Sequence, residues 1–347
     1  MKILIVGDVH WSQYTSILRK RNEYHSLRLD NLIFSINWAE EQAAYCNCSA
    51  IIYLGDFFDS NHLCSEEISA LQHIRWAPIS HIFLTGNHET NVSNLEYSTA
   101  DLFTLCPNSR VIAQPENYII DETDCEFCFL PYILERDRKP LESYFGVKHS
   151  KRIIFSHNDL KDVNYGNFVS PEGFEIGDIH NNSDLFINGH IHHYNHITDR
   201  IINAGNLDGQ NFTENENYRH GIIILDTDTL TTDYIDNPYA IYFRKLDCTK
   251  VHSEEKFESI INNLSGAHVL TIKVNEDFAN TVKQQMKTLI RPNILEYRII
   301  VERTKSSDYN IDTKLEHIDH LEQFKNYVYA NIGTSQIIQD ELAAILT

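Results

Sequence analysis

The sequence predicts an α/β protein, in which a layered sheet is flanked by helices. Short runs of aliphatic and aromatic residues recur along the chain, as in strands that are buried on both faces. Stretches with helical spacing lie between several of these runs, and alternating strands and helices build a layered α/β sheet. The predicted strands lie in KILIVGDVH (2–10), AIIYLGDFFD (50–59), HIFLTGNHE (81–89), RIIFSHND (152–159) and DLFINGHIHH (184–193).

The clearest helix lies between the first two strands. Residues 28–45 place Leu29, Leu32 and Ile36 at helical spacing, which is typical of a helix with one buried face. A shorter helix is expected over 65–77, where a capping-box-like Ser-x-x-Ile lacks the usual Glu. The start of this second helix is therefore not fixed by the sequence.

The character of the chain changes after Asp226. Strand patterns over 242–250, 268–274 and 294–302, with a helical pattern over 277–290, predict a small α/β domain. A helical segment follows, and its apolar stripe consists of Leu315, Ile318, Leu321, Phe324 and Val328. The chain thus divides into a main domain, a small domain and a helical segment, at 1–240, 241–306 and 307–347.

Composition argues against several classes of protein. No apolar run approaches the ~18 residues of a membrane span, and the N-terminal run is too short for a signal peptide, so we expect a cytoplasmic protein. The seven cysteines, an odd number, indicate reduced thiols. The formal charge of −20 argues against tight autonomous binding to nucleic acid. The basic stretch RKRNEYHSLR (19–28) is either a phosphate contact or, more simply, a solvated segment.

Polar residues suited to metal binding stand at the ends of the predicted strands. Asp8 and His10 are two positions apart after the first strand, and His190 and His192 repeat this spacing after the last. Side chains at i and i+2 of an extended chain point to the same side. Each pair can therefore face one ion, whereas the adjacent His193 is turned away.

Three further strand ends add one candidate ligand each, namely Asp56, Asn87 and His157. The complete set has oxygen and imidazole donors but no thiolate, whereas a structural zinc site usually holds cysteines and saturates at four ligands. The set suits two divalent ions that share one carboxylate, and its chemistry fits Mn²⁺, Fe²⁺ or Zn²⁺. A single histidine at a strand end is more often structural, so the prediction rests on the ordered series of motifs.

This series, G-D-x-H, G-D-x-x-D, G-N-H-E, S-H and G-H-x-H, resembles that of the calcineurin-like metallophosphoesterases. The resemblance implies a layered β-sandwich flanked by helices, and two divalent ions, with Mn²⁺ expected first and Mg²⁺, Fe²⁺ or Zn²⁺ as alternatives. It implies that one ion is held by Asp8, His10, Asp56 and His192, and the other by Asp56, Asn87, His157 and His190. His88 matches the family's catalytic histidine, which would protonate the leaving oxygen or stabilise the developing charge.

A second segment resembles the SbcD-type DNA-repair nucleases. Residues 205–226 have the spacing of the segment that closes the nuclease domain of that branch, with Asn206 in place of its Ser and Gly209 in place of its Arg. Asp59 also matches the branch. The positions that keep the spacing are Gly205, Leu207, Phe212, Glu214, Gly221 and Asp226.

This second resemblance implies a DNA exonuclease or endonuclease of recombination, repair or replication. The short chain looks most like the small subunit of the phage recombination endonuclease, which would act in the host-cell cytoplasm. The resemblance implies that 241–306 is a capping domain and that 307–347 binds an SbcC-type ABC ATPase with a coiled coil. It also implies that two copies of this chain form a homodimer within a heterotetramer that includes the ATPase. One alternative is a phosphatase or cyclic-nucleotide phosphodiesterase, because the metal motifs do not choose the substrate. Another is a metal-free scaffold, although such members usually lose ligands.

Overall fold

The structure is a computed structural model that describes residues 1–302, except 16, 92–93, 121–124, 165–168, 215–217 and 289–291. Residues Met1–Arg303 form one compact unit, which contains both the predicted main domain and most of the small domain. The predicted helical segment, with its apolar stripe, lies outside the described residues. Among the helices that are described, none combines the length and the apolar character needed to cross a membrane.

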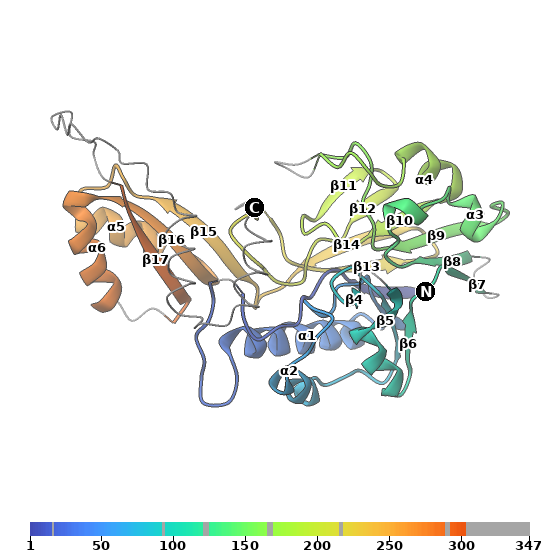
Figure 1. Ribbon diagram of the computed structural model, residues 1–347, viewed down its shortest axis with the longest axis horizontal. Coiled ribbons are helices and arrows are strands. Elements are labelled where there is room, and N and C mark those ends of the chain that lie inside the picture. The colour runs from blue at the N-terminus through green and yellow to red at the C-terminus, as the bar shows by residue number, and fades with distance from the viewer. Residues whose placement is uncertain are drawn as a thin grey trace, which may run out of the picture. The chain divides into compact units, whose positions relative to one another are not determined.

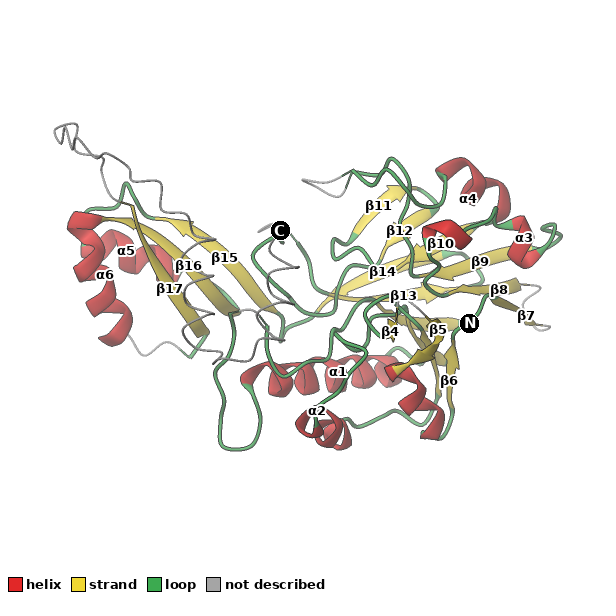
Figure 2. Ribbon diagram, in the orientation of Figure 1, coloured by secondary structure: helices red, strands yellow, loops and turns green. Residues whose placement is uncertain are grey.

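Two six-stranded sheets form the main part of the chain (Figures 1 and 2). The first has the order β14 (Thr231–Asp236), β13 (Gly221–Asp226), β1 (Lys2–Val6), β2 (Ala50–Tyr53), β3 (Ser80–Leu84) and β6 (Ser109–Ile112). The second has the order β11 (Asn195–Thr198), β12 (Ile201–Asn203), β10 (Leu185–Asn188), β9 (Lys151–Ser156), β8 (Cys125–Leu130) and β7 (Glu116–Ile120). All five predicted runs therefore contain a strand, and the predicted mixed α/β class is confirmed.

The alternation along β1 explains how the two sheets and the helices form layers. Ile3 and Ile5 are fully buried in a core shared with strands of the second sheet. Leu4 and Val6 point the other way, into a core shared with helix α1 (Leu27–Tyr45). A strand with both faces covered must be apolar throughout, which is why the run was recognisable in the sequence.

Shorter elements complete the main part. On the outer face of the second sheet, residues of α3 (Glu142–Phe145) and α4 (Ile176–Asn182) enter the core. A two-stranded sheet follows the G-N-H-E motif. The remaining short elements are α2 (Ser65–Ala70), η1 (Leu71–His73), η2 (Thr99–Leu105), η3 (Glu135–Asp137), β4 (Thr90–Asn91) and β5 (Asn94–Ser98).

Helix α2 begins with a capping box that was not predicted from the sequence. Its N-cap is Cys64, and the Glu67 carboxylate accepts a hydrogen bond from the Cys64 backbone N–H at 2.9 Å. The Glu that was missing from a box starting at Ser65 is thus present in a box that starts one residue earlier. The α-helix ends at Ala70, well before the predicted end at 77.

The predicted small domain contains a three-stranded parallel sheet in the order β15 (Ile241–Asp247), β16 (Ala267–Asn275) and β17 (Ile294–Glu302). Helices α5 (Glu254–Asn262) and α6 (Glu276–Thr288) share a core with this sheet. Helix α5 was not predicted. A smaller cluster joins Ile241 and Phe243 of β15 to Leu18 and Phe212 of the main part.

Candidate metal centre

The candidate ligands lie in loops that follow parallel strands of both sheets. Strands β1, β2 and β3 run parallel, as do β9 and β10, so each group presents its carboxyl ends at one edge. Ligand sites of α/β proteins form outside such carboxyl ends. A contact across the two sheets, 3.1 Å between His157 Nε2 and Asn87 Oδ1, brings the two edges together.

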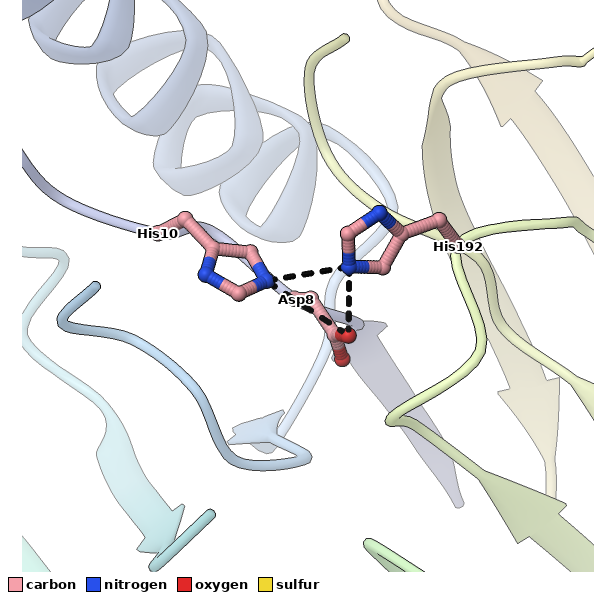
Figure 3. Close-up of side chains that lie close together, drawn as sticks. All are labelled: Asp8, His10 and His192. Carbon is pink, nitrogen blue, oxygen red and sulfur yellow. Dashed lines mark hydrogen bonds and ion pairs between the residues drawn. The ribbon is translucent and has the colours of Figure 1, made fainter. Parts of the chain in front are cut away.

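Asp8, His10 and His192 form the first cluster (Figure 3). The Nε2 atoms of His10 and His192 lie 3.0 Å apart, and they lie 3.9 and 3.5 Å from Asp8 Oδ2, respectively. That oxygen is buried and has no hydrogen-bond partner among the described residues. A buried, unpaired carboxylate oxygen is costly unless a cation is nearby. The cluster therefore fits a divalent cation, and Asp8, His10 and His192 would hold it.

Asp56, His157 and His190 form the second cluster. Asp56 Oδ2 lies 3.2 Å from His157 Nε2, and the His157 and His190 rings are 5.0 Å apart. Asn87 reaches the same His157 nitrogen. Ligand atoms of Asp56 also lie within 4.8 Å of those of His10. Asp56 thus stands between the two clusters, where a shared ligand is required.

Charge coupling in the second cluster is strong. Burial alone would raise the pKa of Asp56, but the adjacent His157, with His10 and His88, holds it well below its usual range. Burial opposes protonation of His157, yet the Asp56 carboxylate raises the pKa of this imidazole to about 9. A metal ligand must be a neutral imidazole, so a bound cation would displace this proton.

The backbone at three ligands is unusual. His10, Asp56 and His190 have φ values of 51°, 48° and 69°, a region that residues other than glycine seldom adopt. The chain at these positions is therefore not extended, and the predicted alternation is wrong there. Asp8 and His10 still share one cluster, but His190 and His192 are divided between the two clusters. Such strained backbone clusters at functional sites.

Hydrogen bonds hold these turns in place. The backbone N–H of His10 donates to the Asp56 carbonyl at 2.9 Å, and that of His190 donates to Asp8 Oδ1 at 2.9 Å. The His88 N–H donates to Asp56 Oδ1, also at 2.9 Å. At Gly86, an added Cβ would lie 2.1 Å from Asp56 Oδ1, so only glycine allows this approach.

His88 is placed differently from the ligands. Its side chain is 44% exposed, and its ring meets the His10 ring edge-on at 4.7 Å. Its Nδ1 lies 3.1 Å from the Asp59 carbonyl oxygen, which can only accept, so Nδ1 carries a proton and Nε2 is left for another partner. Ligand atoms of His88 also lie within 4.8 Å of those of His10 and Asp56, so proximity alone would equally allow it to bind an ion.

Two histidines of NGHIHHYNH have other neighbours. The His193 ring stacks on Tyr218, with 4.5 Å between the ring centroids. His196 Nε2 lies 3.1 Å from the Tyr194 hydroxyl. Neither residue belongs to a described cluster of candidate ligands.

The segment that follows β12 lies against the first cluster. The Leu207 N–H donates to the Asp8 carbonyl at 2.8 Å, and Asp8 also pairs with Asn206 in a β-bridge. At Gly209, a Cβ would lie 2.0 Å from the Ile241 carbonyl oxygen, so there is no room for a side chain. A cation nevertheless reaches this segment, because Arg28 Nη1 donates to the Gly209 carbonyl at 2.8 Å.

Several residues that contact the candidate ligands were not predicted from the sequence. Asp159 lies 3.5 Å from His190 Nε2, and the Leu54 carbonyl accepts from His157 Nδ1 at 2.9 Å. Glu214 Oε1 lies 3.5 Å from His192 Nδ1. Of these residues, only Glu214 was singled out in the sequence, because its position keeps the spacing of the SbcD-type segment. That spacing did not indicate what Glu214 does.

The calcineurin-like phosphoesterase family model matches residues 1–225, and the chain belongs to this family. Its members bind divalent metal ions and hydrolyse phosphoesters, in agreement with the two clusters described above. The protein is therefore a metal-dependent phosphoester hydrolase. No curated protein matches the chain.

Proposed function

We propose that this phosphoesterase is a DNA nuclease that works with an SbcC-type ABC ATPase. The observation that carries the proposal is the 205–226 segment, whose residue spacing resembles the SbcD-type nucleases. This segment touches the metal centre directly, through the Leu207 bond to Asp8 and the approach of Glu214 to His192. The segment that resembles this branch is thus in contact with two of the candidate metal ligands.

Different residues of the chain would have different roles in catalysis. Two bound divalent ions would stabilise charge on the phosphate and lower the pKa of a water molecule. The seven candidate ligands would hold the ions, and burial of Asp8 and Asp56 strengthens the local field because water is excluded. His88, exposed beside them, keeps one proton at Nδ1 against the Asp59 carbonyl, and with a second proton at Nε2 it would donate to the leaving oxygen as an acid or stabilise the developing charge.

A nuclease with a formal charge of −20 must overcome repulsion from DNA. Tight binding needs several Lys or Arg contacts to phosphates. The basic stretch 19–28 offers few: Arg21 pairs with Glu66 at 2.8 Å, and Arg28 is fully buried against Asp208. We therefore infer that the ATPase partner supplies much of the cationic surface.

Substrate preference tests the reaction class. Purified protein with Mn²⁺ is expected to cleave plasmid or hairpin DNA, and Asp8→Ala should abolish this cleavage. A chromogenic phosphomonoester and a cyclic nucleotide serve as competing substrates. Hydrolysis of either one, without cleavage of DNA, would support a phosphatase or phosphodiesterase and overturn the nuclease proposal.

Deletion of 313–347 tests the partner. The apolar stripe of this segment is proposed to dock on the ATPase coiled coil as a helix in a groove; the alternative is that it packs on the chain's own small domain. The truncated protein should keep its metal centre but lose the gain in DNA binding and cleavage that the ATPase gives the full chain. Tight binding of duplex DNA by the isolated full chain at physiological salt, with no gain from the ATPase, would contradict the proposal.

A further inference from the structure

His192 has two ring nitrogens with different surroundings. Its Nε2 lies 3.5 Å from Asp8 Oδ2 and 3.0 Å from His10 Nε2, and in Figure 3 this nitrogen points at both residues while Nδ1 points away. Nδ1 lies 3.5 Å from Glu214 Oε1. The ring thus has a candidate metal on one side and a carboxylate on the other.

The Glu214 carboxylate is itself held in place. Its Oε1 accepts from Asn206 Nδ2 at 3.0 Å and from the Gln210 N–H at 2.9 Å. The side chain is only 4% exposed, and Oε2 is buried with no hydrogen-bond partner among the described residues. A buried carboxylate with an unsatisfied oxygen is expensive unless positive charge compensates it. The neighbour of Oε2 is the His220 ring, whose Nε2 lies 3.9 Å away. On the Oε1 side, the His192 imidazole would supply positive charge to the carboxylate when it binds a divalent cation.

We propose that Glu214 is a positioning residue for His192. Its carboxylate accepts the Nδ1–H, which fixes the tautomer and the orientation of the ring so that Nε2 faces the first ion. Metal-binding histidines commonly carry such a partner on the second nitrogen, and losing it costs about 10–100-fold in metal affinity. The inference depends on metal binding by the family and not on the proposed DNA substrate.

Asn206, which stands where the SbcD-type pattern has Ser, supports the proposed role of Glu214. Its Nδ2 donates to Glu214, and its Oδ1 lies 2.6 Å from His220 Nδ1, which fixes which end of the amide faces the carboxylate. A serine hydroxyl in its place would have a single hydrogen and a shorter reach. The departure from the SbcD-type pattern at this position therefore provides a donor that holds Glu214.

The test measures Mn²⁺ affinity, with Glu214→Gln, Glu214→Leu and a matched control. The control is Glu40→Gln, because Glu40 and His81 form another buried pair, at 2.9 Å, among residues outside the metal clusters. Calorimetric titration of the metal-free proteins should show that Glu214→Leu binds one of two ions roughly 100-fold more weakly. Glu214→Gln keeps an acceptor oxygen but loses the charge, so about a tenfold loss is expected. Glu40→Gln should bind both ions as the parent does.

The electron paramagnetic resonance signal of bound Mn²⁺ gives a second readout that a general loss of stability would not move. It should change in Glu214→Leu and stay unchanged in Glu40→Gln. If Glu214→Leu does not fold, the isosteric Glu214→Gln decides the matter alone. Parental affinity for both ions in the Glu214 variants would overturn the proposal, and so would an equal loss in Glu40→Gln. Absence of DNA cleavage would refute only the nuclease proposal, since these readouts need no substrate.

Discussion

Replacing Arg28 with methionine should destabilise the protein by about 3 kcal/mol, because it breaks a buried ion pair. Arg28 Nη1 lies 2.6 Å from Asp208 Oδ2, and both side chains are 0% exposed. The pair joins helix α1 to the 205–214 segment. Methionine has a similar length and no charge, so the change removes the cation and leaves the carboxylate buried.

The hydrogen bonds that remain around each partner determine how much stability each substitution costs. After Arg28→Met, Asp208 keeps hydrogen bonds from Asn31 Nδ2 at 2.9 Å and from the N–H groups of Gly209 and Ile241 at 3.0 and 2.5 Å. This places the loss near the lower end of the roughly 3–5 kcal/mol range for breaking a buried pair. Asp208→Asn should cost more, about 5 kcal/mol, because it leaves a buried guanidinium. Nε and Nη2 of that guanidinium have no partner among the described residues.

The double variant Arg28→Met/Asp208→Asn should lose less than the sum of the two single variants, because each single value includes one uncompensated charge. The assay is thermal and urea unfolding, followed by circular dichroism in excess EDTA, so that bound metal does not shift the transition. For a chain of 347 residues, the Arg28→Met loss corresponds to a fall in Tm of roughly 4 °C.

An exposed ion pair provides the control. Arg75 Nη2 lies 2.8 Å from Glu41 Oε1, with the two side chains 73% and 62% exposed. Arg75→Met should cost no more than about 1 kcal/mol, as is usual for surface pairs. The reasoning is refuted if Arg28→Met costs no more than Arg75→Met, or if the losses of the double variant are simply additive.

Three further predictions concern the metal centre. Asp8→Ala and His192→Ala should each remove ion binding at one position and abolish Mn²⁺-dependent hydrolysis in a folded protein, as measured by metal content and rate. His193→Ala should change little, because His193 stacks on Tyr218 and belongs to no described cluster of candidate ligands; an inactive His193→Ala beside an active His192→Ala would reverse the assignment. His88→Asn should keep both ions but lower turnover by roughly two to four orders of magnitude. Parallel loss of metal and rate on the same preparation would make His88 a ligand.

How far the fold could be predicted depends on where each strand lies in its sheet. Central strands such as β1 are covered on both faces, so they appear as continuous apolar runs. The edge strand β14 reads TTDYID, with alternating partial burial, and its pattern resembles that of a loop. The polar end of each central strand was equally visible, which is why the candidate ligands could be selected by sequence alone.

The geometry of the centre was less predictable because it depends on tertiary contacts. In an extended chain, the side chains of each predicted pair would point to the same side. His10 and His190 instead adopt left-handed backbone, which hydrogen bonds to the distant residues Asp56 and Asp8 maintain. No local pattern encodes those partners. The same holds for Glu214, which approaches His192 only because both loops meet at the sheet edges.

The two departures from the SbcD-type pattern have a common physical consequence. Asn206 directs its amide inward to Glu214, and Gly209 leaves room for the β15 carbonyl that a side chain would displace. Arg28 of helix α1, which contacts this segment, is buried against Asp208 and cannot reach a phosphate. Arg219, within the segment, is exposed but is paired with Asp236 at 2.7 Å. The segment therefore contacts the candidate metal ligands, while the two cations described here are both already paired with carboxylates. If the chain is the DNA nuclease proposed above, its formal charge of −20 requires cationic surface from elsewhere to hold the DNA backbone, and this requirement is the physical reason for proposing a partner.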